Sequence, residues 1–154
     1  MNILVLCTGN SARSILLEAI LADLGYDSFS AGSKPAGQVH PEALKTLARH
    51  GIVANAPRSK SWDEFAGPDA PVMDLVVTVC GNAAGETCPV LPAKDGVAPA
   101  RAHWGVDDPA AADPAKQPDA FKTAFQILRR RALAFDALPD KRAVAALAAI
   151  GNLS

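Results

Sequence analysis

The sequence predicts an α/β fold organised around an open parallel sheet. Short apolar or β-branched runs, typical of buried strands, alternate along the chain with segments in which apolar residues recur at helical spacing. A length of 154 residues suits one domain with a single sizeable core, which we place at residues 1–154. The chain shows no internal repeat and no segment typical of a linker between domains.

The first elements are expected to be a buried strand, an amphipathic helix and a second strand. Residues 3–6 are Ile, Leu, Val and Leu, a continuous apolar run that predicts the first strand. Residues 27–31 predict a second short strand that ends at Gly32. The helix between these strands has one apolar face, formed by Leu17, Ile20, Leu21 and Leu24.

The remaining elements continue the alternation. Pro41 suits the first position of a helix, and Gly51 suits the end of that helix. Residues 74–79 are Asp, Leu, Val, Val, Thr and Val, a continuous run rich in β-branched residues that predicts a strand buried on both faces. Residues 81–118 show little periodicity and are predicted to be mostly loop, whereas 121–135 predict a long amphipathic helix and the alanine-rich residues 141–150 a final one.

Composition narrows the expected partners and location. The formal net charge of −1 provides no basic surface for nucleic acid or for an anionic membrane. No apolar stretch is long enough to span a bilayer, and the N-terminal run is too short for a signal peptide, so we expect a cytoplasmic protein. Three cysteines in a reducing compartment favour reactive thiols over a structural disulfide framework.

The segment from Cys7 to Ser14, a Cys-x5-Arg-Ser loop between the first strand and the first helix, is expected to bind an oxyanion. A sharp turn beside a helix N-terminus directs backbone N–H groups into one concave space, and Arg13 adds a bidentate fork. The same field favours the thiolate of Cys7, which makes it a candidate nucleophile. Ser14 is expected either to hydrogen-bond Cys7 or to cap the helix. The predicted oxyanion-binding residues are Thr8, Gly9, Asn10, Ser11, Ala12, Arg13 and Ser14.

This loop resembles the phosphate loop of the low-molecular-weight protein tyrosine phosphatase superfamily. The resemblance implies that the aspartate of an Asp-Pro pair, Asp108 here, is the general acid, with Asp107 as its competitor. Two departures stand out. Residues 110–112 are alanines where phosphatases of this kind carry aromatic residues, and Ala12 occupies a position that is often a second cysteine.

Two further cysteines follow the predicted strand at 74–79. Cys80 comes directly after that strand and Cys88 lies beyond a short glycine-containing segment, so the two could close into a disulfide. If the strands that end in Cys7 and Cys80 are neighbours, both thiols lie at one edge of the sheet. A zinc site with His103 is an alternative that lacks the usual paired ligand spacing, and small buried core residues are another.

Taken together, the loop at Cys7, the Cys-x7-Cys-Pro motif and the segment His103 to Pro109 resemble the arsenate reductases built on the phosphatase fold, over residues 1–135. The resemblance implies an open parallel four-stranded sheet with helices on both faces. It also implies a relay in which Cys7 attacks arsenate, Cys80 attacks Cys7, and Cys88 attacks Cys80. The implied reductant is thioredoxin, or alternatively glutaredoxin with glutathione, and no tightly bound cofactor is expected.

Two other functions are consistent with the same residues. A phosphatase acting on phosphomonoesters would need the loop and Asp108 but neither distal cysteine, and residual phosphatase activity is also expected of a reductase. A non-catalytic module that binds oxyanions or senses thiols would not need Asp108. The resemblance further implies a potassium site at Asn10, Glu18 and Ser30, although Glu18 could equally be an ordinary exposed helix residue.

Overall fold

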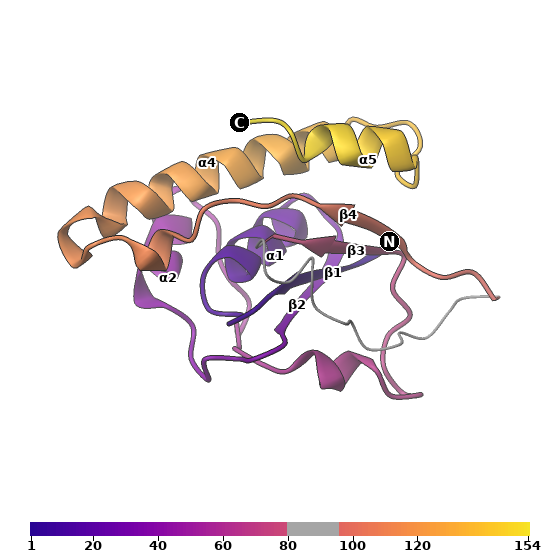
Figure 1. The fold of residues 1–154 in the computed structure, drawn as a ribbon, viewed down its shortest axis with the longest axis horizontal. Helices are drawn as coiled ribbons and strands as arrows, with labels where there is room; N and C mark the ends of the chain where they lie inside the picture. The colour runs from indigo at the N-terminus through magenta and orange to yellow at the C-terminus, as the bar shows by residue number, and fades with distance from the viewer. Residues whose placement is uncertain (80–95) are drawn as a thin grey trace.

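The computed structural model describes residues 1–79 and 96–154 of the chain. At its centre is a four-stranded parallel sheet in the order β2-β1-β3-β4 (Figure 1). The strands are β1 (Asn2–Cys7), β2 (Asp27–Gly32), β3 (Leu75–Thr78) and β4 (Ala100–His103). The predicted open parallel sheet is therefore confirmed, and β1 and β3 are neighbours, which the sequence had left open. That residues 1–154 form one domain stays a prediction.

Helices cover both faces of the sheet. Those with α geometry are α1 (Arg13–Asp23), α2 (Pro41–Arg49), α4 (Gln117–Asp136) and α5 (Val144–Ile150). Helix α4 packs against α1, α2 and α5, and together they cover one face, while the short 3-10 helix η1 (Trp62–Phe65) lies on the other (Figure 1). Two more 3-10 helices, η2 (Pro109–Ala111) and η3 (Pro114–Lys116), lead into α4.

The apolar run of β1 is continuous because both of its faces are buried. Ile3 and Val5 belong to the large cluster under the α-helices, whereas Leu4 and Leu6 pack with Phe65 on the η1 side. Alternate residues of a strand point to opposite faces, so a strand covered on both sides needs apolar residues at every position.

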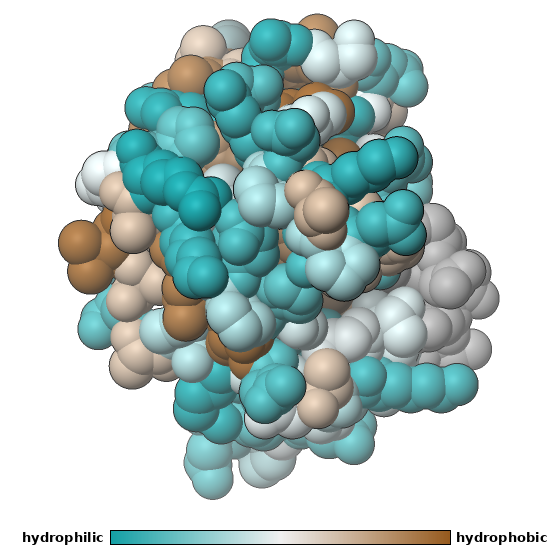
Figure 2. Space-filling view, turned by 90° about the vertical axis from the view of Figure 1, so that its left-hand side faces the viewer, coloured by the Kyte–Doolittle hydropathy of each residue, from teal (hydrophilic) through white to brown (hydrophobic). Residues whose placement is uncertain are grey.

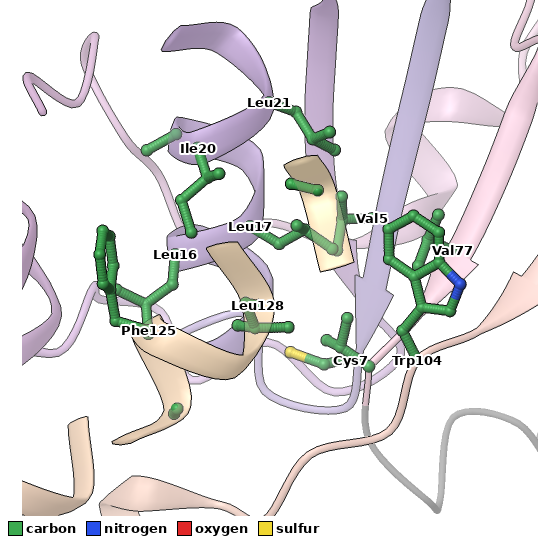
Figure 3. Packing of buried hydrophobic residues seen from close by; sticks show 14 of the residues in the cluster. Val5, Cys7, Leu16, Leu17, Ile20, Leu21, Val77, Trp104, Phe125 and Leu128 are labelled. Carbon is green, nitrogen blue, oxygen red and sulfur yellow. The ribbon is translucent and has the colours of Figure 1, made fainter. Parts of the chain in front are cut away.

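Helix α1 is buried around most of its circumference, rather than along one face as predicted. Leu16 is as buried as Leu17, because α1 lies between the sheet and α4 (Figure 3). Leu24, expected on the apolar face, is the residue at which the helix ends.

Strand β4 is the element that the sequence prediction missed, because it falls within the predicted loop 81–118. Its residues are Ala, Arg, Ala and His, and alternate ones are exposed. Within residues 1–79 and 96–154 its one pairing partner is β3, at the end of the strand order. Backbone hydrogen bonds define such an edge strand, and these leave little trace in the pattern of apolar residues.

The surface shown in Figure 2 is mostly hydrophilic, and its hydrophobic residues form small separate patches. Within residues 1–79 and 96–154, no helix has the length and apolar character needed to cross a membrane.

Candidate active site

The candidate site lies where β1 ends and α1 begins. Cys7 is the last residue of β1 and is only 3% exposed (Figure 3). Ala12 precedes α1, and its methyl group cannot accept a hydrogen bond from the N–H groups of the first helical turn. These donors and the positive end of the helix dipole therefore remain suited to an anion.

The sulfur of Cys7 lies within hydrogen-bonding distance of two donors. The backbone N–H of Asn10 donates to Sγ over 3.2 Å, and Oγ of Ser14 lies 2.9 Å from it. The side-chain amide of Asn10 in turn donates to Ser14 Oγ over 2.8 Å. The Ser14 hydroxyl can therefore donate to the sulfur of Cys7 while its oxygen accepts from Asn10.

The side chain of Asn10 holds the loop in place. It is fully buried and has a left-handed backbone with φ of 45°, a conformation that asparagine tolerates better than most residues. Besides its bond to Ser14, Nδ2 donates to Ser30 Oγ over 3.0 Å, and Oδ1 accepts from the backbone N–H of Lys60 over 2.9 Å. The side chain thus joins the loop to β2 and to the segment before η1.

The rest of the loop is held by its carbonyl oxygens. The backbone N–H groups of Lys34, Ala36 and His40 donate to the carbonyls of residues 8, 9 and 11, each over 2.9 Å. Gly32 permits this close approach, since a Cβ there would lie 2.4 Å from the carbonyl oxygen of Thr8. These bonds join the loop backbone to residues 34–40.

Arg13 connects this loop to the segment that carries Asp108. Its Nη1 donates to the carbonyl oxygen of Val106 over 3.0 Å, and Nη2 lies 3.7 Å from Oδ2 of Asp108. The second distance is an ion-pair contact without a direct hydrogen bond. Arg13 is 15% exposed and Asp108 43%, so the carboxylate stands at the open side of the site.

Asp108 has the extended backbone expected before a proline, and its Oδ1 accepts from the N–H of Ala110 over 3.0 Å at the start of η2. Asp107 lies beside it and lines a cavity of about 230 Å³ between this segment and α4. The structure thus brings Asp108 to Arg13, while its role as an acid remains a prediction.

Glu18, Ser30 and Asn10 lie next to one another, as expected. Ser30 Oγ donates to Glu18 Oε2 and accepts from Asn10. Burial raises the pKa of Glu18 above its ordinary value of 4.5, and the Ser30 hydroxyl, Lys60 and Arg58 oppose that rise. Burial also lowers the pKa of Lys60, whose charge faces Glu18.

The predicted distal thiols, Cys80 and Cys88, lie outside the described residues. His103, the alternative metal ligand, has its Nδ1 2.7 Å from the hydroxyl of Thr78. Across the two described ranges, no cluster of three or more His, Cys, Asp or Glu side chains could hold a metal ion.

Sequence reasoning missed three residues that shape the site. Ser59 donates its hydroxyl to the carbonyl of Gly9 over 3.1 Å, and the backbone of Lys60 holds Asn10. Both lie about fifty residues away in sequence and carry no motif. Arg131 is the third of them; it is buried in α4, and its spacing three residues after Leu128 on the apolar face of that helix was an available signal.

Comparison with known proteins agrees with this geometry. The sequence profile of the family "Low molecular weight phosphotyrosine protein phosphatase" matches residues 2–143. An arsenate reductase of Halalkalibacterium halodurans is 41% identical over 112 residues, which are 70% of this chain and 73% of that protein.

Two solved structures have the same fold. The Erwinia amylovora tyrosine phosphatase AmsI superposes with a TM-score of 0.66 at 23% identity, covering 90% of this chain and 93% of that one. A thioredoxin-dependent arsenate reductase of Corynebacterium glutamicum superposes with a TM-score of 0.55 at 25% identity, covering 83% of this chain and 58% of that one. The chain belongs to the low molecular weight phosphotyrosine protein phosphatase family, and arsenate reductases are among its relatives there.

Proposed function

We propose that this protein reduces arsenate to arsenite, with Cys7 as the nucleophile. The observation that carries the proposal is the placement of Cys7 Sγ, 2.9 Å from Ser14 Oγ and 3.2 Å from the N–H of Asn10, in a rigid loop beside Arg13. Arsenate is a tetrahedral oxyanion, so the loop N–H groups and the guanidinium suit it. The arsenate reductases among the relatives support the choice of substrate.

The first step forms a bond from Cys7 to arsenic. The thiolate attacks As(V), and protonated Asp108 gives its proton to the oxygen that leaves as water. The proposal gives Asp108 this role because its carboxylate is partly exposed and lies 3.7 Å from Arg13, the cation expected to bind the oxyanion. Negative charge that develops on the remaining oxygens is balanced by Arg13 and by the loop N–H groups.

The second step transfers two electrons to arsenic. The thiolate of Cys80 attacks the sulfur of Cys7, the electron pair of the sulfur–arsenic bond moves to arsenic, and arsenite departs as As(III). Cys88 then attacks Cys80, which frees Cys7 and leaves a disulfide between Cys80 and Cys88. This relay is inferred from the sequence motifs alone. A thioredoxin-like reductant is the expected partner, since one relative is thioredoxin-dependent, and glutaredoxin with glutathione is the alternative.

The predicted potassium site fits the observed side chains only in part. Glu18 and Ser30 offer oxygen ligands, but Oδ1 of Asn10 already accepts from Lys60, and the Lys60 ammonium brings positive charge to Glu18. Potassium binding at Asn10, Glu18 and Ser30 therefore stays a prediction, and no step of the reaction depends on it.

A phosphomonoester phosphatase is the second candidate, because the family is named for that activity and its first step uses the same nucleophile and cradle. Residues 110–112 are alanines, so the segment after Asp108 offers no aromatic wall for a phenyl ring. We therefore propose phosphatase activity only as a residual property.

The deciding experiment is arsenate-dependent NADPH oxidation, with the thioredoxin system and the glutaredoxin–glutathione system supplied in turn. Oxidation with either system is expected, and its rate should vanish without arsenate. If neither system supports oxidation while p-nitrophenyl phosphate is hydrolysed, the phosphatase reading is correct. A protein that binds arsenate but turns over neither substrate would be the non-catalytic module.

A further inference from the structure

Arg131 is a buried cation that the proposed reaction does not use. It lies in α4 and is 6% exposed, and its partners among the described residues are backbone carbonyls. Nη1 donates to Trp104 O over 2.7 Å and to Gly105 O over 3.0 Å, and Nε donates to Leu153 O over 2.9 Å. Burying a guanidinium is costly unless such bonds compensate, so these carbonyls are held firmly.

The segment that contains α5 holds the same stretch of chain from another side. The indole of Trp104 is fully buried and donates to the carbonyl oxygen of Leu147 over 3.0 Å. Gly151 lies so close that a Cβ there would be 2.4 Å from His103 O and 3.2 Å from the Trp104 ring. In Figure 1, α5 lies alongside the C-terminal part of α4 and over β4. Most of this segment lies beyond residues 2–143, the part matched by the family profile.

Trp104 and Gly105 are followed directly by the segment that carries Asp108, the proposed proton donor. Val106 donates its N–H to Val79 O over 3.0 Å and accepts from Arg13, and Asp108 follows two residues later. Beneath this segment lies the cavity of about 230 Å³ lined by α4, which gives the chain room to shift if its start is released. Trp104 and Gly105 are therefore connected to Asp108 by a short stretch of chain that is itself held at Val106.

We propose that Arg131 is a positioning residue. With the help of the α5 segment, it keeps Asp108 over the Cys7 loop. This inference rests on the proposed function, in which Asp108 is the proton donor. Arg131 touches neither substrate nor reacting atoms, and it acts through the carbonyls at Trp104 and Gly105.

The first test is amide hydrogen exchange over residues 104–110 in Arg131→Lys. A lysine keeps the positive charge but lacks the planar guanidinium fork that reaches carbonyls on two segments. Amide hydrogen exchange at residues 104–110 is therefore expected to accelerate by about tenfold. The matched control is Arg130→Lys, an exposed neighbour on the same helix, which should exchange like the wild type. If Arg131→Lys does not fold, Gly151→Ala disturbs the same stretch by steric pressure and should give the same result.

The second test is a double-mutant cycle with Asp108→Asn, measured on kcat for arsenate. Arg131→Lys alone should lower kcat by about tenfold with little change in KM, and should have no further effect once Asp108 is Asn. Additive losses, or unchanged exchange at 104–110, would overturn the proposal. A wild type that reduces no arsenate would refute the proposed function instead, while the exchange measurement would still decide whether Arg131 holds this segment.

Discussion

At the scale of single residues, Cys7 and Arg13 carry the proposed chemistry. Cys7→Ser should abolish arsenate reduction and any phosphatase activity, because both reactions need a sulfur nucleophile in this loop. Arg13→Lys should lower kcat/KM by about 100-fold or more, since an ammonium cannot reproduce the planar fork that faces the Asp108 segment. Steady-state assays with arsenate and p-nitrophenyl phosphate measure both effects. Retained turnover in Cys7→Ser would refute the nucleophile.

The two neighbouring aspartates should behave differently. Asp108→Asn is expected to slow formation of the arsenic adduct by about 100-fold and to leave oxyanion binding intact, because the proton donor is lost while the cradle remains. Asp107→Asn is the matched control and should have a much smaller effect, since the carboxylate 3.7 Å from Arg13 belongs to Asp108. Rapid-quench measurement of the adduct and isothermal titration with phosphate separate the two steps. The reverse ranking would assign the acid to Asp107.

Glu18 should make the protein less stable as pH rises, whereas a carboxylate in a surface ion pair makes a protein less stable as pH falls. Burial raises the pKa of Glu18, so the folded protein favours the protonated form of this side chain. The contribution of Glu18 to the free energy of unfolding is therefore lost as pH rises through the raised pKa. Glu18→Gln should therefore unfold at a slightly higher temperature than wild type at pH 7, and the gap should close below the ordinary value of 4.5. Thermal unfolding at both pH values measures this.

Glu64 is the contrasting control, because its hydrogen bond with Arg58 lowers its pKa. Its contribution to the free energy of unfolding is present at pH values above the ordinary pKa of a glutamate. Glu64→Gln should lower the unfolding temperature slightly at pH 7 and have no effect in acid. If both variants shift stability in the same direction at pH 7, burial does not dominate at Glu18.

At the scale of elements, the junction of β1, β2 and the Cys7 loop depends on one glycine. Gly32→Ala should destabilise the protein by about 1–3 kcal/mol, because its Cβ would meet the backbone oxygen of Thr8 at 2.4 Å. Gly9→Ala is a matched control within the loop, since no atom outside its immediate neighbours lies within 4 Å of a Cβ there. Urea unfolding compares the two variants. Equal stability of Gly32→Ala and wild type would mean that the loop backbone can shift at little cost.

The elements that sequence could predict are those that local pattern determines. The Cys7 loop was predictable because a buried strand, a small polar turn and a helix follow one another within about twenty residues. The strand at β4 was not, because its register against β3 comes from backbone pairing at a sheet edge. The bracing of Asn10 by Lys60 was also beyond local pattern, because it depends on which distant segment folds against the loop.

At the scale of the whole molecule, the parallel sheet gathers residues from distant parts of the chain at one edge. The Cys7 loop extends the carboxyl end of β1, and the segment with Asp108 follows β4. Ligands of open parallel sheets bind beyond the carboxyl ends of the strands, and this edge is where Cys7 and Asp108 lie although they are far apart in sequence. On the α4 side of the sheet, Arg131 donates to the carbonyls of Trp104 and Gly105, which precede the segment with Asp108.

The proposed thiol relay separates the reductase hypothesis from the phosphatase hypothesis, because only reduction would use it. Cys80→Ser should stall with arsenic bound to Cys7, while hydrolysis of a small aryl phosphate continues, because hydrolysis never uses Cys80. Cys88→Ser should release one arsenite and then hold a disulfide between Cys7 and Cys80, since the thiol that would resolve this bond is missing.

Mass spectrometry of both variants after a single arsenate turnover distinguishes these species, and Cys7→Ser serves as the control that should form no adduct. Oxygen cannot replace sulfur in either relay step, because a serine hydroxyl neither attacks a sulfur–arsenic adduct nor forms a disulfide. Sustained multi-turnover reduction by both serine variants would eliminate the internal relay. An external thiol would then have to attack Cys7 directly, and the rate of reduction should depend on the concentration of that thiol.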